Sequence, residues 1–116
     1  MTSVRSRPTD YRAASEARDI YLAVVSGDFG KARPVVVVQS DIGSSLTSRV
    51  ICPFTTYFEP AAHLRLQIDP TPQNGLIERS YVMLEKIAGV PAHRFRDRIG
   101  RLEEEDGAGA RLLGLC

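Results

Sequence analysis

The sequence has no long apolar run. No stretch approaches the ~20 residues that a membrane-spanning helix needs, and the opening residues, MTSVRSRPTDYRAASEA, lack the apolar block of a secretory signal. We therefore expect a cytoplasmic protein with no membrane partner.

Cysteine is also scarce. Cys52 lies in an apolar stretch and Cys116 is the last residue, which is neither a disulfide framework nor the ligand spacing of a zinc site. The sequence contains no P-loop, no GxSxG and no HExxH motif. We expect two free thiols, no bound metal and no cofactor.

Lysine is rare, whereas arginine is abundant. Lys31 and Lys86 are the lysines among 15 Lys and Arg residues, so 13 are arginine. The planar guanidinium suits phosphates and base edges better than an ammonium does, but arginine-rich codon usage would give the same count. The formal net charge is only +1, so composition leaves both explanations open.

Residues 93–101 (HRFRDRIGR) carry four arginines and are followed by LEEED. Acids in the first turn of a helix complement its dipole. We therefore expect a solvated entry into a short C-terminal helix over 103–116, with a basic surface for an acidic partner as the alternative.

The length and composition are those of one domain. The chain has 116 residues, of which 43% are hydrophobic and 25% are charged. Residues 1–17 show no sustained period and are expected to form a flexible arm, and residues 18–116 the folded domain.

Five segments read as β-strands. Residues 18–25 (RDIYLAVV) and 33–40 (RPVVVVQS) are rich in β-branched side chains. The four valines of the second segment are apolar on both faces, which predicts a central strand that is covered on both sides. Residues 49–54 predict a third strand, which Pro53 should confine to an edge or an end.

The remaining two strands lie on either side of a wide turn. Residues 63–69 (HLRLQID) alternate with period two, and 80–90 predict a fifth strand that bends at Gly89. Between them, Asn74 and Gly75 are expected at positive φ. The side chains expected to face inward from 63–69 are Leu64, Leu66 and Ile68. The pattern predicts a mainly β fold, a small SH3-like, partly closed antiparallel barrel.

The loop before the valine strand offers a rigid cation. Pro34 restricts the backbone around Arg33, and the valines after it anchor the strand in the core. A guanidinium held this way can stabilise developing negative charge without first reorganising. Asp28, Phe29 and Lys31 lie in the same loop. The alternative is that Arg33 simply pairs with an acid at a strand start.

Two other sets of polar side chains are candidates for chemistry. Thr55 and Thr56 follow the third strand, where hydroxyls usually bond to the backbone of a turn. His63 and His93 are the residue types for acid–base work on a phosphodiester, but nothing in the sequence fixes their separation.

Several blocks, in this order, resemble the MazF/PemK family of toxin endoribonucleases: RDIYLA, GDFGKARPVVVVQSDIG, VICPFTT, PTPQNGLIERSYVMLEKI and IGRL. The resemblance covers roughly residues 18–102. It implies a small β-barrel built as a homodimer, metal-independent cleavage of single-stranded mRNA at short sequence motifs, and a cognate antitoxin whose flexible tail covers the RNA groove.

The resemblance also assigns roles. Arg33 falls on the family's strand-opening arginine and would handle the proton and stabilise charge as the substrate's 2′-OH attacks the adjacent phosphate, while Thr55 would hydrogen-bond that phosphate. Since arginine stays protonated in most settings, the electrostatic role is the better supported. Phe29 could stack on a base and Lys31 could meet a phosphate. The residues expected to bind RNA are Phe29, Lys31, Ser40, Thr56 and Arg79.

Departures from the family pattern keep two other functions open. EARDIYL has Ala and Arg where an Arg-Gly pair is expected, Ser80 stands nearest to the place of an assisting acid, and GARLLGLC ends the chain early. A catalytically impaired module that only binds an antitoxin is therefore an alternative. A CcdB-like gyrase poison is another, although LLGLC has no aromatic residue of the kind that group uses to bind gyrase.

Overall fold

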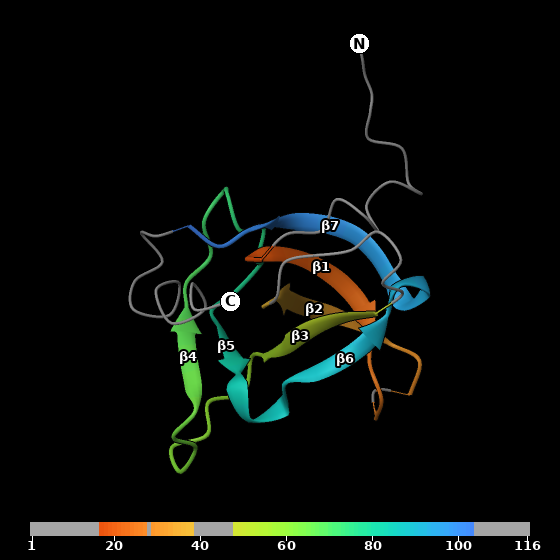
Figure 1. The fold of residues 1–116 in the computed structure, drawn as a ribbon. Coiled ribbons are helices and arrows are strands. Elements are labelled where there is room, and N and C mark those ends of the chain that lie inside the picture. The colour runs from red at the N-terminus through yellow and green to blue at the C-terminus, as the bar shows by residue number, and fades with distance from the viewer. Residues whose placement is uncertain (1–16, 28, 39–47, 104–116) are drawn as a thin grey trace.

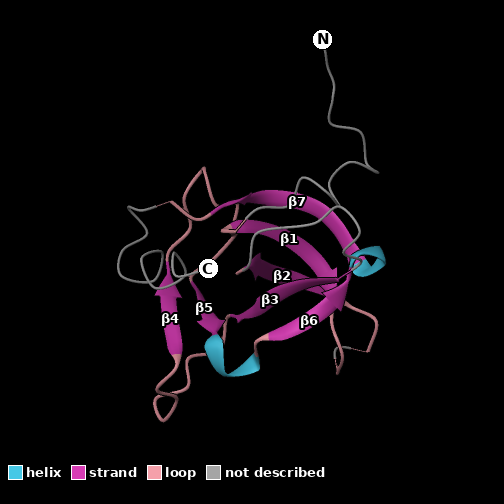
Figure 2. Cartoon of the chain, in the orientation of Figure 1, coloured by secondary structure: helices cyan, strands magenta, loops and turns pink. Residues whose placement is uncertain are grey.

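The computed structural model describes residues 17–27, 29–38 and 48–103 (Figure 1). The described part is mainly β, as predicted (Figure 2). Its strands are β1 (Asp19–Val24), β2 (Ala32–Val37), β3 (Ser48–Thr55), β4 (Arg65–Ile68), β5 (Ser80–Met83), β6 (Ala88–Pro91) and β7 (Phe95–Arg101). Two short 3-10 helices are η2 (Leu84–Lys86) and η3 (Ala92–Arg94). No helix in these ranges has the length and apolar character to span a membrane.

The strands pair antiparallel in the order β4-β5-β3-β2-β1-β7, and β6 pairs with β3 outside this order. Figure 1 shows β7, β1, β2 and β3 following one another along a strongly curved sheet. β4 and β7 end the order without pairing with each other, so the curved sheet does not close into a barrel. The predicted arm over 1–17 and helix over 103–116 lie almost entirely outside the described residues.

The valines of β2 form the centre of the core. Val36 and Val38 belong to one apolar cluster and Val35 and Val37 to another, and none of the four is more than 4% exposed. β2 also pairs with β1 on one side and with β3 on the other. The prediction of a central strand covered on both faces is confirmed. Burying each valine contributes roughly 1.5–3 kcal/mol.

Of the two placements predicted for Pro53, at an edge or at an end, the edge is wrong, and Pro53 lies near the end of β3, two residues before Thr55. β3 pairs with β2 on one side. On its other side β3 pairs with β6 as far as Ile51 and with β5 from Phe54 onward. Val38 N–H donates to Val50 O at 2.9 Å. Because hydrogen-bonded and non-hydrogen-bonded pairs alternate along antiparallel strands, the nitrogen of Pro53 points away from β2. It lies where the neighbouring strand changes, so no ladder bond is lost.

Residues 95–101 form strand β7 and not the predicted helix entry. β7 pairs with β1, and two of its arginines form ion pairs with an acidic residue of β1. Asp19 Oδ1 lies 3.2 Å from Arg98 Nη2 and 3.1 Å from Arg101 Nη1, and the side chain of Asp19 is 6% exposed. Because Asp19 is far away in the sequence, the local pattern of charges in residues 93–101 could not reveal these ion pairs.

The predicted fifth strand over 80–90 is two strands. β5 pairs with β3 and β4, η2 follows, and β6 then pairs with the opposite end of β3. The inward direction predicted for Leu64 is also wrong, because Leu64 is 55% exposed and precedes β4. Ile68 is buried as predicted, and Leu66 is half-buried.

The turn between β4 and β5 is built around Asn74. Gly75 has the predicted positive φ of 71°, but Asn74 is not among the described residues with positive φ. Asn74 is instead fully buried, and its Oδ1 accepts hydrogen bonds from the backbone N–H groups of Thr71 and Leu76 at 3.0 Å. Its Nδ2 donates to Asp69 O at 2.9 Å. Satisfying a buried amide in this way holds the turn in one conformation.

Candidate active site

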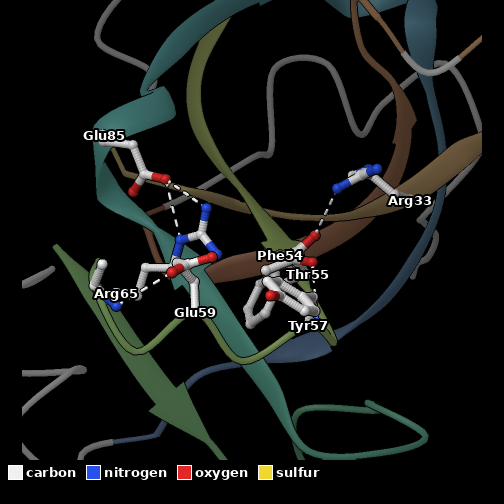
Figure 3. Close-up of polar contacts among 8 residues, drawn as sticks. Arg33, Phe54, Thr55, Tyr57, Glu59, Arg65 and Glu85 are labelled. Carbon is white, nitrogen blue, oxygen red and sulfur yellow. Dashed lines mark hydrogen bonds and ion pairs between the residues drawn. The ribbon is translucent and has the colours of Figure 1, made fainter. Parts of the chain in front are cut away.

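Arg33 lies at the beginning of β2 and its side chain crosses to β3. The guanidinium Nη1 donates to the backbone carbonyl of Phe54 at 3.1 Å (Figure 3). Arg33 is half-buried. The guanidinium is thus attached to the strand end that carries Thr55, while part of it remains accessible to a substrate.

The register of the sheet explains why Arg33 and Thr55 are neighbours. Val35 is the partner of Pro53 in the β2–β3 ladder, and continuing that register by two residues sets Arg33 opposite Thr55. The alternation that directs the Pro53 nitrogen away from β2 makes this a non-hydrogen-bonded pair. In such pairs the two side chains share a face and lie closest together.

Thr55 has one hydrogen bond to the following turn. Its Oγ1 accepts from the backbone N–H of Tyr57 at 3.2 Å (Figure 3), which is the ordinary turn role of such a hydroxyl. The hydroxyl oxygen is the acceptor in that bond, so its hydrogen can still donate to a phosphate oxygen. Thr56 is exposed beside it.

A depression of about 250 Å³ lies over this strand end. It brings together four of the residues predicted from the sequence: Lys31, Arg33, Thr55 and Thr56. Its other lining residues are Ala32, Pro34 and Phe54. None of the described lining residues is acidic, so the surface offers two cations and two hydroxyls to an anion.

A second depression, of about 240 Å³, also has Arg33 in its lining. Lys86 and Arg94 line it together with Arg33, and its described lining residues again include no acid. Sequence reasoning missed Lys86 and Arg94 because each reaches the site through η2 or η3. The scarcity of lysine was the one signal that could have drawn attention to Lys86.

The other predicted RNA-binding residues have different surroundings. Phe29 is 99% exposed and has a positive φ of 54°, so its ring is presented to solvent. Arg79 does not line either depression, and its Nε donates to Asp69 Oδ1 at 2.8 Å. The hydrogen bond and charge of Asp69 raise the pKa of Arg79. Ser40 and Asp28 lie outside the described residues.

The remaining candidates do not join the site. His63 and His93 are exposed and line neither depression. Ser80 is 4% exposed and its Oγ donates to Glu78 O at 2.9 Å, so it does not face a substrate. In the ranges that the structure describes, no group of three or more His, Cys, Asp or Glu side chains could hold a metal ion.

One ion pair fixes η2 to β4. Arg65 Nε and Nη2 both donate to Glu85 Oε2, at 3.1 and 2.9 Å (Figure 3). Burial acts to raise the pKa of Glu85, but the hydrogen bonds and charges of Arg65 and the neighbouring groups together outweigh it and lower that pKa. The pair holds the helix that carries Lys86.

The family model of the PemK-like, MazF-like toxin of type II toxin-antitoxin systems matches residues 16–109. The chain belongs to this PemK/MazF family.

Two curated relatives of this PemK/MazF chain carry the name of an enzyme. The probable endoribonuclease MazF of Mycolicibacterium smegmatis is 42% identical over 89 residues, which are 76% of this chain and 82% of that protein. The endoribonuclease EndoA of Bacillus subtilis is 32% identical over 92 residues, 75% of this chain and 79% of that protein. Both relatives are named as endoribonucleases, which supports the predicted ribonuclease over the gyrase-poison alternative.

A solved structure shares the PemK/MazF fold. The Mycobacterium tuberculosis toxin MazF-mt6 superposes with a TM-score of 0.66 over 83% of this chain and 91% of that one, at 24% identity. At this identity the likeness concerns the fold, and it confirms the mainly β architecture predicted from the sequence.

Proposed function

We propose that this toxin-family chain is a metal-independent endoribonuclease that cleaves single-stranded mRNA at short sequence motifs. The observation that carries the proposal is the Arg33–Phe54 hydrogen bond of 3.1 Å, which holds a guanidinium at the strand end bearing Thr55. Membership of the family and the two relatives named endoribonucleases support it.

In the proposed reaction the 2′-OH of the substrate gives up its proton to water and attacks the adjacent phosphorus. The bond to the 5′-oxygen breaks, and that oxygen takes up a proton from water. Arg33 stabilises the negative charge that builds on the phosphoryl oxygens, and the Thr55 hydroxyl donates to one of them. Donors fixed before the reaction avoid the cost of reorganising during it. The products would be a 2′,3′-cyclic phosphate and a 5′-hydroxyl.

The RNA would extend from this centre along the two cationic depressions. Lys31 and Thr56 lie beside the scissile phosphate in this proposal, and Phe29 offers its exposed ring for base stacking. We also expect Ser40, which is outside the described residues, to bind RNA. Arg79 can take part if a phosphate replaces Asp69 as its partner. Lys86 and Arg94 provide two further cations for the backbone.

The antitoxin that completes a type II system would compete for the same cationic surface through an acidic or flexible segment. We further propose a homodimer that acts in the cytoplasm, with residues 1–17 as an arm outside the domain formed by 18–116. No cofactor enters the reaction.

Cleavage of mixed single-stranded RNA in EDTA, with mapping of the new 5′ ends, tests the proposal. We expect cuts at one short motif, 5′-hydroxyl ends, and no cleavage when the ribose before the cut is 2′-deoxy. Arg33→Ala should lower the rate by about 10²–10³, the usual cost of one fixed oxyanion donor. Cleavage that requires added metal, or that is unaffected by Arg33→Ala, would contradict the proposal.

A further inference from the structure

β2 carries a proline where strands seldom do. Pro34 lies within β2, which is paired on both sides, with β1 and with β3. A proline inside a sheet removes a ladder hydrogen bond, so prolines occur mostly at edges, ends and bulges. Position 34 must therefore leave one carbonyl without its backbone donor.

The register identifies that carbonyl. The bond from Val38 N–H to Val50 O makes those two residues a hydrogen-bonded pair. Bonded and non-bonded pairs alternate, and the β2–β3 register is constant along the ladder. Continued along both strands, this register puts Pro34 and Phe54 at a position where the ladder would normally be hydrogen-bonded. There the Phe54 carbonyl faces the proline nitrogen, which has no hydrogen to donate.

No second carbonyl is lost on the other side. Pro34 is opposite Leu22 in the β1–β2 ladder. Since the N and O atoms of one strand residue point to the same neighbour, the Pro34 nitrogen points away from β1. The missing bond is therefore confined to the carbonyl of Phe54, a residue that is 2% exposed. A buried carbonyl left without a donor is costly.

The side chain of Arg33 supplies the missing donor, through Nη1 at 3.1 Å. We propose that Pro34 is a positioning residue: by withholding a backbone N–H from the Phe54 carbonyl, it reserves that carbonyl for Arg33 and fixes the guanidinium beside Thr55. The contact stands on the sheet geometry alone, while its consequence for cleavage rests on the proposed function.

Any ordinary residue at position 34 would restore the backbone donor. A carbonyl has two lone pairs, so the new N–H would compete with Arg33 without excluding it. Arg33 would then sample more rotamers, and less of the enzyme would have its cation in place for the reaction. We expect a partial loss of rate, about tenfold, comparable to one hydrogen bond.

The test compares the wild type with Pro34→Val and Pro34→Ala, two variants in case one folds poorly. Single-turnover RNA cleavage should show kcat lower by about tenfold with KM nearly unchanged. NMR of the Arg33 side-chain nitrogens should show faster hydrogen exchange in both variants than in the wild type. Pro72→Val, in an exposed loop outside both depressions, controls for loss of a proline and should change neither readout.

A double-mutant cycle separates positioning from a general effect on the fold. In an Arg33→Ala background, Pro34→Val should leave the residual kcat unchanged, because the group that Pro34 positions is gone. An equal tenfold loss in both backgrounds would overturn the proposal, and so would wild-type exchange of the Arg33 nitrogens in Pro34→Val. If the wild type cleaves no RNA, the proposed function fails, and the exchange measurement still decides whether Pro34 positions Arg33.

Discussion

Gly100 of β7 lies directly against the backbone carbonyl of Asn74. A Cβ placed at Gly100 would be 2.4 Å from the carbonyl carbon and oxygen of Asn74 and from the carbonyl oxygen of Gln73. All three contacts are with backbone atoms. Arg101 N–H donates to the same Gln73 oxygen at 2.8 Å. The turn between β4 and β5 is therefore seated on β7 with no room between them.

Gly100→Ala should destabilise the protein by about 1–3 kcal/mol, because either β7 or the turn must move. Thermal or urea unfolding measures the difference. Gly89→Ala is the matched control, since a Cβ at Gly89 in β6 has no heavy atom within 4 Å. Equal stability of the two variants would show that the turn is not seated on β7 as described.

Asn74→Ala should cost about 2–4 kcal/mol, because it removes the acceptor of two backbone N–H groups and the donor to Asp69 O within a buried turn. Gln73→Ala, at the adjacent exposed position, should change the free energy of unfolding by less than about 0.5 kcal/mol. Urea denaturation of both variants makes the comparison. A small effect at Asn74 would mean that the turn does not depend on its amide.

The Glu85–Arg65 pair predicts a dependence of stability on pH. The pKa of Glu85 is lower in the folded state, so its contribution is present above the unfolded pKa and is lost as pH falls through the folded pKa. The Glu85 side chain is 33% exposed, and such pairs contribute about 0.2–1 kcal/mol.

Glu85→Gln should therefore reduce stability by that small amount at pH 7 and by progressively less as the pH falls through the lowered pKa of folded Glu85, where the carboxylate becomes protonated. Denaturation at a series of pH values detects the convergence. Glu78→Gln, at an exposed position, serves as the control. If the effect of Glu85→Gln on stability grew as the pH fell, the lowered pKa of folded Glu85 would be contradicted.

Substitutions of Thr55 and Thr56 should change different kinetic parameters. Thr55→Val removes the hydroxyl that faces Arg33 across the ladder, so kcat should fall by about 10–100-fold with a small change in KM. Thr56→Val removes a hydroxyl from the exposed rim and should act mainly on KM. Single-turnover cleavage over a range of RNA concentrations separates the two effects. A loss of kcat at Thr56 alone would transfer the proposed phosphate contact to that residue.

Asp69→Asn should tighten RNA binding, since Arg79 would exchange its carboxylate partner for a phosphate. For single strands, one added phosphate contact should steepen the dependence of log K on log salt by about 0.7. Arg79→Ala should have the opposite effect on affinity without altering kcat. Fluorescence titrations at several salt concentrations measure both slopes. Unchanged slopes in both variants would exclude Arg79 from the RNA path.

Local sequence was sufficient for the elements whose pattern is local. The run of valines predicted a strand buried on both faces, and Gly75 was predicted at positive φ. The same reasoning failed for β7. Its arginines have the local pattern of a solvated helix entry, but they bind Asp19, which is 79 and 82 residues away in the sequence. Local sequence could not decide between an edge and an end for Pro53, because the change of neighbour from β6 to β5 is a property of the whole sheet.

The candidate site likewise has residues that the sequence predicted and contacts that it could not predict. Arg33, Lys31, Thr55 and Thr56 were predicted from motifs, and the structure brings them to one depression. That Arg33 is held by the carbonyl of Phe54 could not be predicted, since it depends on a register set by residues further along both strands. Lys86 and Arg94 were missed because only the path of η2 and η3 places them near Arg33.

The position of Cys52 makes unfolding measurable by chemistry. Cys52 is fully buried in β3, the strand that pairs with β2, β5 and β6. A thiol reagent can reach its sulfur only after β3 separates from these neighbours. This separation breaks the central pairing of the sheet and so requires unfolding. In a protein whose other cysteine, Cys116, is replaced by serine, the rate of thiol labelling would report how often the whole domain opens, and a bound antitoxin or RNA would slow it.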